Sequence, residues 1–138
     1  LAPGREGPTS SANERNAPPA PLVDAPIALV PGPDAGDVDL DALATVDLHV
    51  AAASDRTGTR LDGPPIARRS PGAATGAMSR RSTPMVIGAI ELTPSGLIVL
   101  GPDHPTTGGY PVIAVVRASS LDALFAKPIG APVRFTIA

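Results

Sequence analysis

Short apolar runs, separated by turn residues, dominate the chain from about residue 26 onwards. Each run is rich in Val, Ile or Ala and is only a few residues long, which is typical of strands rather than helices. The runs are PIALV (26–30), LHVAAA (48–53), MVIGAIEL (85–92), LIVL (97–100), PVIAVVR (111–117) and VRFTIA (133–138). The pattern therefore predicts a mainly β domain.

One hairpin is predicted within this pattern. The runs at 85–92 and 97–100 are joined by the four residues TPSG, with Pro94 in the second turn position and Gly96 in the fourth. That placement suits a type I turn between antiparallel strands.

Two short helices are predicted between the strands. In VDLDALATV, Asp39 is placed to cap a helix that begins at Leu40; in ASSLDALFAKPIG, Ser119 is placed as N-cap, and Lys127 with Pro128 marks the end. Helices of two or three turns depend on tertiary packing for their stability. We therefore expect a barrel or sandwich with small helices at its edges.

Two segments lack any apolar period. Residues 1–25 are rich in Pro, Ala, Ser and Gly and cannot bury enough surface to offset their ordering entropy, so we expect a disordered linker before a domain at 26–138. Residues 68–84, RRSPGAATGAMSRRSTP, contain two Arg pairs among small residues. This irregular loop is either a solvated surface loop or a loop that binds a phosphate or a partner.

Composition narrows the class of protein. The 138 residues are sized for one domain, and with 2% aromatic residues and no Trp the core must come from Val, Ile, Leu and Ala. A net charge of −2 and the lack of a basic face argue against a nucleic-acid partner. No apolar run approaches the roughly 20 residues of a membrane span, and no signal peptide is visible, so a cytoplasmic protein without a membrane partner is the expectation.

Metal, thiol and nucleotide chemistry find little support. There is no Cys, and the two histidines, His49 and His104, have only Asp47 and Asp103 close by in sequence, whereas a zinc or iron site wants about three converging ligands. Because His49 alternates with apolar neighbours in a predicted strand, it is expected to face solvent or to be satisfied locally. We predict no metal site. No phosphate-binding glycine loop and no serine-hydrolase elbow occur, so ATP, if used, is bound elsewhere or by another chain.

The polar turn SDRTGTRLDGPP, residues 54–65, has two interpretations. In the first, Asp55 caps backbone N–H groups in an Asx turn while Arg56 and Arg60 are solvated. In the second, Arg56 and Arg60 bind an anion, because a guanidinium matches a carboxylate bidentately.

A second polar stretch, GPDHPTTGGYP at 101–111, is also ambiguous. Two adjacent glycines let backbone approach a ligand and present N–H groups to an oxyanion, while an acid, an imidazole and hydroxyls stand beside them. Glycines before a strand are equally ordinary bulge chemistry. The candidate residues are Asp103, His104, Thr106, Thr107, Gly108, Gly109 and Tyr110.

Together these stretches resemble a known family. SDRTGTRLDGPP, then PMVIGAIELTPSG, then DHPTTGGYPVIAVV, in that order, are similar to the C-terminal half of the biotin-dependent carboxyltransferase family. Its members include the C subunit of bacterial 5-oxoprolinase, the second allophanate hydrolase subunit and the carboxyltransferase part of urea carboxylase. The resemblance runs from about residue 26 to 138.

The resemblance implies a cyclophilin-like β-barrel, the second of two in a full-length member, and a small partner subunit resembling the B subunit of 5-oxoprolinase. It implies a hydrolase-like hetero-oligomer acting on a small amide, lactam or urea-like substrate of the 5-oxoproline or urea class. ATP would be on another subunit or biotin on a separate carrier, and the chain is expected to be inactive without an N-terminal barrel that it lacks. The single lysine, Lys127, does not lie on the kind of hairpin that carries biotin. The residues carried over as catalytic are Asp103, His104, Thr106, Thr107, Gly108 and Gly109; those carried over as substrate-binding are Asp55, Arg56, Arg60 and Tyr110.

The sequence also departs from the family pattern. Many members read D-x-Q-T-T-G-G-Y, whereas Pro105 stands here in place of the amide side chain and removes its donors and acceptor. This leaves a competing prediction open, in which the barrel is a non-catalytic binding or regulatory module.

Overall fold

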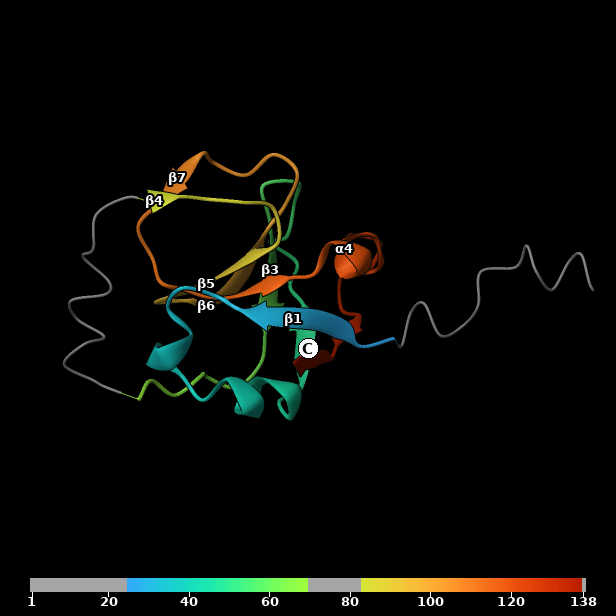
Figure 1. The fold of residues 1–138 in the computed structure, drawn as a ribbon. Helices are drawn as coiled ribbons and strands as arrows, with labels where there is room; N and C mark the ends of the chain where they lie inside the picture. The colour runs from blue at the N-terminus through green and yellow to red at the C-terminus, as the bar shows by residue number, and fades with distance from the viewer. Residues whose placement is uncertain (1–24, 70–82, 138) are drawn as a thin grey trace, which may run out of the picture.

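The structure, a computed structural model, describes residues 25–69 and 83–137 (Figure 1). The predicted linker, apart from Ala25, and most of the irregular loop at 68–84 lie outside the described residues. The remainder forms a mainly β barrel with one α-helix, as the apolar runs predict.

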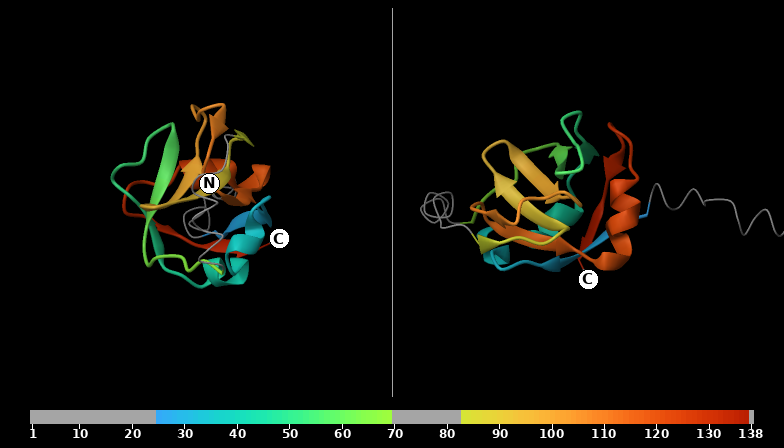
Figure 2. Two further views of the ribbon diagram at one scale, coloured as in Figure 1. Left: turned by 90° about the vertical axis from the view of Figure 1, so that its left-hand side faces the viewer. Right: turned by 90° about the horizontal axis from the view of Figure 1, so that it is seen from above.

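Eight strands form the main sheet, which curves around on itself (Figure 2). Buried side chains fill its interior. A separate ribbon of two short strands stands beside it, above β5 and β6 in the view of Figure 1. Along the main sheet the order is β10 (Phe135–Ile137), β1 (Ile27–Pro31), β8 (Val112–Val116), β5 (Ala89–Thr93), β6 (Gly96–Leu100), β3 (Gly58–Asp62), β2 (Leu48–Val50) and β9 (Pro132–Val133); the small ribbon pairs β4 (Thr83–Pro84) with β7 (Thr107–Gly108).

A single stretch of chain supplies both edges of the main sheet. Strands β9 and β10 are consecutive in sequence, separated only by Arg134, yet β9 pairs antiparallel with β2 and β10 pairs parallel with β1. The Arg134 carbonyl itself accepts a hydrogen bond of 2.7 Å from the Ile27 amide. This crossing segment therefore brings the two edges of the sheet together and nearly closes the barrel.

The barrel interior is packed with aliphatic residues, and a β-bulge sets which face of β8 they occupy. Ile90 pairs with Ala114 but the next residue, Glu91, pairs with Val112, so Ile113 is the extra residue in β8. As a result Ile113 and Ala114 both belong to the inner core, whereas Val112 faces outward. The sequence predicts an aliphatic core, and the one aromatic exception is Phe135, which is 2% exposed.

The predicted hairpin is confirmed, with β5 and β6 paired from Ile90–Val99 to Thr93–Gly96. Gly96 has a positive φ of 119°, a conformation that favours glycine after a tight turn. Several strand limits differ from the prediction. Strand β5 begins only at Ala89, because the chain turns at Gly88 with φ of 87°. Likewise β2 ends at Val50, and the last predicted run is divided at Arg134.

The helices also need correction. The first predicted helix is a 3-10 helix, η2 (Leu40–Ala44), and Asp39 makes no side-chain capping bond. Another 3-10 helix, η1 (Ala35–Asp37), precedes it. The α-helix, α4 (Ala118–Phe125), begins before Ser119, so the predicted N-cap lies inside the first turn and the cap position is Arg117. Ser120 is the structural serine, since its hydroxyl accepts a 3.0 Å bond from the Ala28 amide of β1.

Candidate functional site

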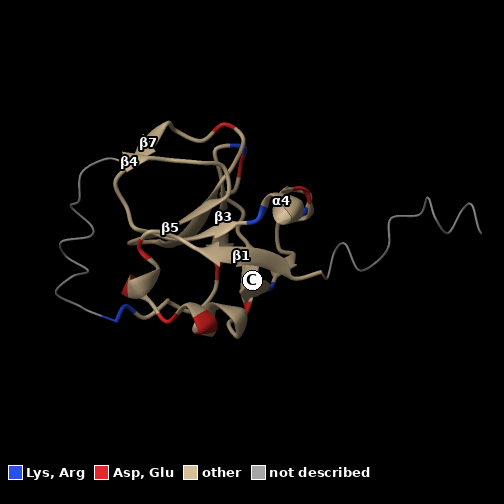
Figure 3. Cartoon of the chain, viewed as in Figure 1, with Lys and Arg blue, Asp and Glu red and all other residues tan. Residues whose placement is uncertain are grey.

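The two polar turns predicted from sequence lie against each other. Arg56 Nε donates to Asp103 Oδ2 at 2.9 Å, and the backbones are bonded as well: Gly101 N donates to Thr57 O and Asp103 N to Arg56 O, each at 3.0 Å. In Figure 3 this is where a basic and an acidic segment meet at the top of the barrel. The hydrogen bond and the charge of Asp103 raise the pKa of Arg56, which stays a cation.

Gly101 makes this close approach possible. A Cβ atom at position 101 would overlap the carbonyl oxygen of Arg56. Because that oxygen is a backbone atom held by the Asp103 amide, it has no free rotamer with which to move away. A glycine is therefore required by contact rather than by a left-handed φ.

Asp55 forms the Asx turn that the first interpretation predicts. Its Oδ1 accepts from Thr57 N at 2.9 Å and from Gly58 N at 3.2 Å. Ser54 and the Arg60 backbone bond to each other across the same turn, with Arg60 N donating to Ser54 Oγ at 2.9 Å. Asp55 thus shapes the loop from which Arg56 projects.

Arg56 and Arg60 do not converge into a single clamp. Arg56 sits in the loop at the barrel mouth, where it lines a pocket of about 290 Å³ together with Asp55, Phe125 and Lys127. Arg60 lies on β3 with an exposed side chain. The anion clamp predicted as a pair is therefore divided between the mouth and the wall of the barrel.

The strand register shows which residues share Arg60's face. Arg60 pairs with Ile98, and Ile98 pairs with Glu91, so these three side chains lie in one row on the outer face of β3, β6 and β5. The next row holds Leu100 and Ala89, which pack with Met85 in a second apolar cluster outside the barrel. Gly108 of the small ribbon lies over the Glu91 and Met85 side of this face, while Arg60 at its other side is exposed.

Glu91 is the residue that the sequence analysis missed. It is 8% exposed in the middle of a strand, and burial raises the pKa of its carboxyl group. Gly108 of the polar loop lies directly over it, because a Cβ atom at 108 would sit 2.7 Å from Glu91 Oε2 and 3.2 Å from Met85 Cε. The available signal was a lone glutamate within the apolar run MVIGAIEL.

The rest of the loop is held by its own backbone. His104 Nδ1 donates to the Pro105 carbonyl at 2.6 Å, so in the neutral ring Nε2 is left as an acceptor. Thr106 O accepts from Met85 N at 3.0 Å. Thr107 and Gly108 form β7 and pair with β4, which holds the loop in a ribbon rather than in the predicted bulge alone. Gly109 follows half-buried, and Tyr110 is 38% exposed.

Two further questions from the sequence concern metals and membranes. Across residues 25–69 and 83–137, no three His, Asp or Glu side chains gather in a way that could hold a metal ion. His49 is exposed between two buried strand neighbours, as predicted. Within the same described ranges, none of the helices has the length and apolar character needed to cross a membrane.

The comparisons of this chain with known proteins agree with one another on its family. A family model described as "Carboxyltransferase domain, subdomain A and B" matches residues 1–137. The C subunit of 5-oxoprolinase from Haemophilus influenzae is 35% identical over 83 residues, which are 59% of this chain and 25% of that protein. The match therefore spans about a quarter of the length of this curated relative.

Solved structures show the same barrel. A crystal structure of TTHA0988 is 32% identical, with a TM-score of 0.69, over 87% of this chain and 23% of that one. The Kluyveromyces lactis urea carboxylase gives a TM-score of 0.71 at 22% identity, over 80% of this chain and 10% of that one. At that identity the second likeness concerns the fold alone.

Proposed function

The chain belongs to the family of carboxyltransferase domains with subdomains A and B, and from this premise we propose that it forms one wall of the catalytic cleft of an enzyme acting on a small amide, lactam or urea-like substrate. One observation carries the proposal: the loops holding the two most distinctive motifs are bonded to each other through Arg56 and Asp103. Loops held by a rigid barrel are where binding and catalytic groups concentrate.

We assign roles by charge and burial. Asp103 orients Arg56, whose remaining N–H groups bind the carboxylate or carboxy group of a substrate. Further hydrogen-bond donors to the substrate come from the surface residues Arg60, Thr106, Thr107 and Tyr110. Asp55 fixes the conformation of the loop that holds Arg56. His104 Nε2 and the amides of Gly108 and Gly109 face the reacting group as proton acceptor and oxyanion donors.

Glu91 is assigned the part of a general base. A buried carboxylate with a raised pKa accepts a proton more readily than an exposed one, and an amide or lactam nitrogen must lose a proton in order to gain a carboxy group. Because Gly108 lies directly over the carboxylate, access to Glu91 requires the loop at 101–111 to shift. The same loop thus controls both binding and proton transfer.

The proposal includes other components. The match spans about a quarter of the curated 5-oxoprolinase relative, so we propose that a second barrel and a small partner subunit supply the opposite wall. Biotin on a separate carrier, or ATP on another subunit, would supply the activated carboxy or phosphoryl group. Lys127 stands just beyond the C-cap residue of α4, Ala126, so on this proposal the biotinylated lysine belongs to the carrier chain.

The test uses the assembled complex. The chain is co-expressed with the proposed additional barrel and partner subunit, and ATP turnover dependent on 5-oxoproline or urea is measured. We expect Arg56→Ala, Asp103→Ala and Glu91→Gln each to lower kcat at least tenfold. The matched control is Arg69→Ala, because Arg69 forms a similarly exposed ion pair with Asp39 at 3.8 Å but stands outside both polar turns. Full activity in both the Arg56→Ala and the Asp103→Ala variant would contradict the assignment of these residues to the catalytic cleft.

Pro105 favours a second candidate function, a non-catalytic binding or regulatory module. It stands in the motif where a side-chain amide is common, and its carbonyl accepts the hydrogen bond of His104 Nδ1. Light scattering on the isolated chain separates the two functions. A regulatory module should be folded and monodisperse by itself, whereas half of a cleft should need its partners.

A further inference from the structure

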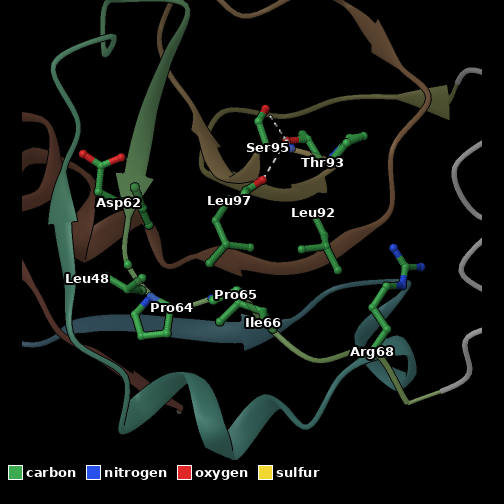
Figure 4. A pocket seen from close by; sticks show the side chains of 14 residues that line it. Leu48, Asp62, Pro64, Pro65, Ile66, Arg68, Leu92, Thr93, Ser95 and Leu97 are labelled. Atoms are coloured by element: carbon green, nitrogen blue, oxygen red, sulfur yellow. Dashed lines mark hydrogen bonds between the residues drawn. The ribbon is translucent and has the colours of Figure 1, made fainter.

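A second pocket opens on the barrel away from Arg56 and from the loop at 101–111, next to the end of the stretch 54–65. It has a volume of about 390 Å³, which lies within the usual range of small-molecule sites. Four inward-facing leucines of the core form its floor, and the segment after β3, with Pro64, Pro65 and Ile66, forms one side (Figure 4). The floor residues are Leu48, Leu61, Leu92 and Leu97.

Arg68 lines this pocket and is incompletely bonded. Its Nη2 donates to Asp37 Oδ2 at 3.0 Å, and the side chain is only 13% exposed. Its Nε and Nη1 atoms are buried, and no group within residues 25–69 and 83–137 forms a hydrogen bond with either of them. Buried donors of a charged group are nearly always satisfied, so two unsatisfied ones indicate a missing acceptor.

Figure 4 shows how the polar groups are distributed around the leucines. Arg68 rises along one edge with its guanidinium beside Leu92, while Asp62 stands on the opposite side and points away from the floor. Thr93 and Ser95 are engaged with their own hairpin turn, where Thr93 Oγ1 bonds to Gly96 O at 2.7 Å. Arg68 therefore provides the cationic donors that the floor lacks.

We propose that this pocket binds a small monocarboxylate that carries a short hydrocarbon group. The carboxylate accepts from Arg68 Nε and Nη1, and the hydrocarbon lies on the four leucines. Asp37 already balances part of the guanidinium charge, so a singly charged ligand fits better than a phosphate. An apolar floor with one charged group at its edge is the usual pattern of a small-molecule site. The proposal does not depend on the proposed function, because none of the residues assigned a role there, Asp55, Arg56, Arg60, Glu91 and those of the loop at 101–111, lines this pocket.

Hexanoate is the probe, with neutral hexanamide as its matched control. Both are titrated into the full chain while amide shifts are followed by two-dimensional NMR. We expect saturable shifts at Leu61, Leu92 and Leu97 with hexanoate, and at least tenfold weaker binding of hexanamide. Equal binding of the two probes, an absence of saturable shifts, or shifts confined to residues 54–60 and 101–110 would overturn the proposal.

Two variants locate the binding. Arg68→Lys keeps a positive charge beside Asp37 but removes Nε and Nη1, so hexanoate affinity should fall at least tenfold; Arg69→Lys, at the exposed neighbouring position, should leave it unchanged. If Arg68→Lys fails to fold, Leu97→Phe decides, because it fills the pocket without touching the ion pair and should abolish binding. Unchanged affinity in the folded Arg68→Lys variant, or in Leu97→Phe, contradicts the assignment.

Discussion

Gly108 lies directly over Glu91, so that a Cβ atom on the glycine would be 2.7 Å from the carboxylate oxygen Oε2. This contact connects the polar loop to the wall of the barrel. It also differs in kind from the contact at Gly101, where the obstructing atom is the backbone carbonyl of Arg56.

The first prediction compares these two glycines. Gly108→Ala meets the ends of two side chains, Glu91 and Met85, which can shift, so we expect a loss of about 1 kcal/mol in the free energy of unfolding. Gly101→Ala meets a fixed carbonyl and should cost about 3 kcal/mol. Urea unfolding measures both. Gly36→Ala is the control, because a Cβ atom there meets nothing within 4 Å. Equal losses at 101 and 108 would contradict this account.

The second prediction concerns pH. Burial raises the pKa of Glu91 above its ordinary 4.5, so the folded state holds this proton more tightly than the unfolded state. Its contribution to stability is complete below the unfolded pKa and is lost as the pH rises through the folded pKa. Glu91→Gln cannot titrate. The variant should therefore gain stability relative to the parent as the pH rises above the unfolded-state pKa, as chemical unfolding at several pH values would measure. A difference that is constant with pH would refute the prediction.

The third prediction distinguishes the two adjacent serines of α4. Ser120 is 9% exposed and its hydroxyl accepts from the Ala28 amide, so Ser120→Ala leaves a donor of β1 without its partner. We expect a loss of about 1–2 kcal/mol. Ser119→Ala should change stability by less than about 0.5 kcal/mol, because Ser119 is exposed and does not cap the helix. Thermal unfolding of the two variants compares their stabilities directly. A larger loss of stability in Ser119→Ala than in Ser120→Ala would indicate that Ser119 caps the helix after all.

The fourth prediction concerns the closing strand. Phe135 is the largest fully buried side chain and pairs with Ile27. Phe135→Ala should cost about 3–5 kcal/mol, while Thr136→Ala, at the exposed next position, should be nearly neutral. Guanidinium unfolding provides the measurement. A small loss at 135 would mean that this strand is not needed for closure.

Much of the barrel could be predicted from local pattern. The β5–β6 hairpin follows from TPSG between two apolar runs, and the alternation of Leu48, His49 and Val50 correctly places the histidine outside. The Asx turn at Asp55 follows from side-chain chemistry within three residues. These features depend on neighbours in the sequence, which is the information that a single sequence holds.

The remaining features depend on register between distant strands. Glu91 shares a face with Arg60 only because β6 lies between β5 and β3 in one particular register. The division of the last run at Arg134, and the choice of Ser120 over Ser119, likewise follow from where β1 lies. Arg56 and Arg60 stand four residues apart in sequence, yet one joins the barrel mouth and the other the outer face.

The segment that supplies both sheet edges has a consequence for the order of folding. Strand β1 is the first of the described strands to leave a ribosome, but its partner β10 is the last of them to be made. Until residues 132–137 emerge, β1 and β2 both present unpaired backbone that could join with another chain. The nascent chain on the ribosome therefore has an open sheet with two unpaired, aggregation-prone edges. Pairing of strands so far apart in sequence is also slow. Nascent chains of this barrel should depend on chaperones until that last segment is released.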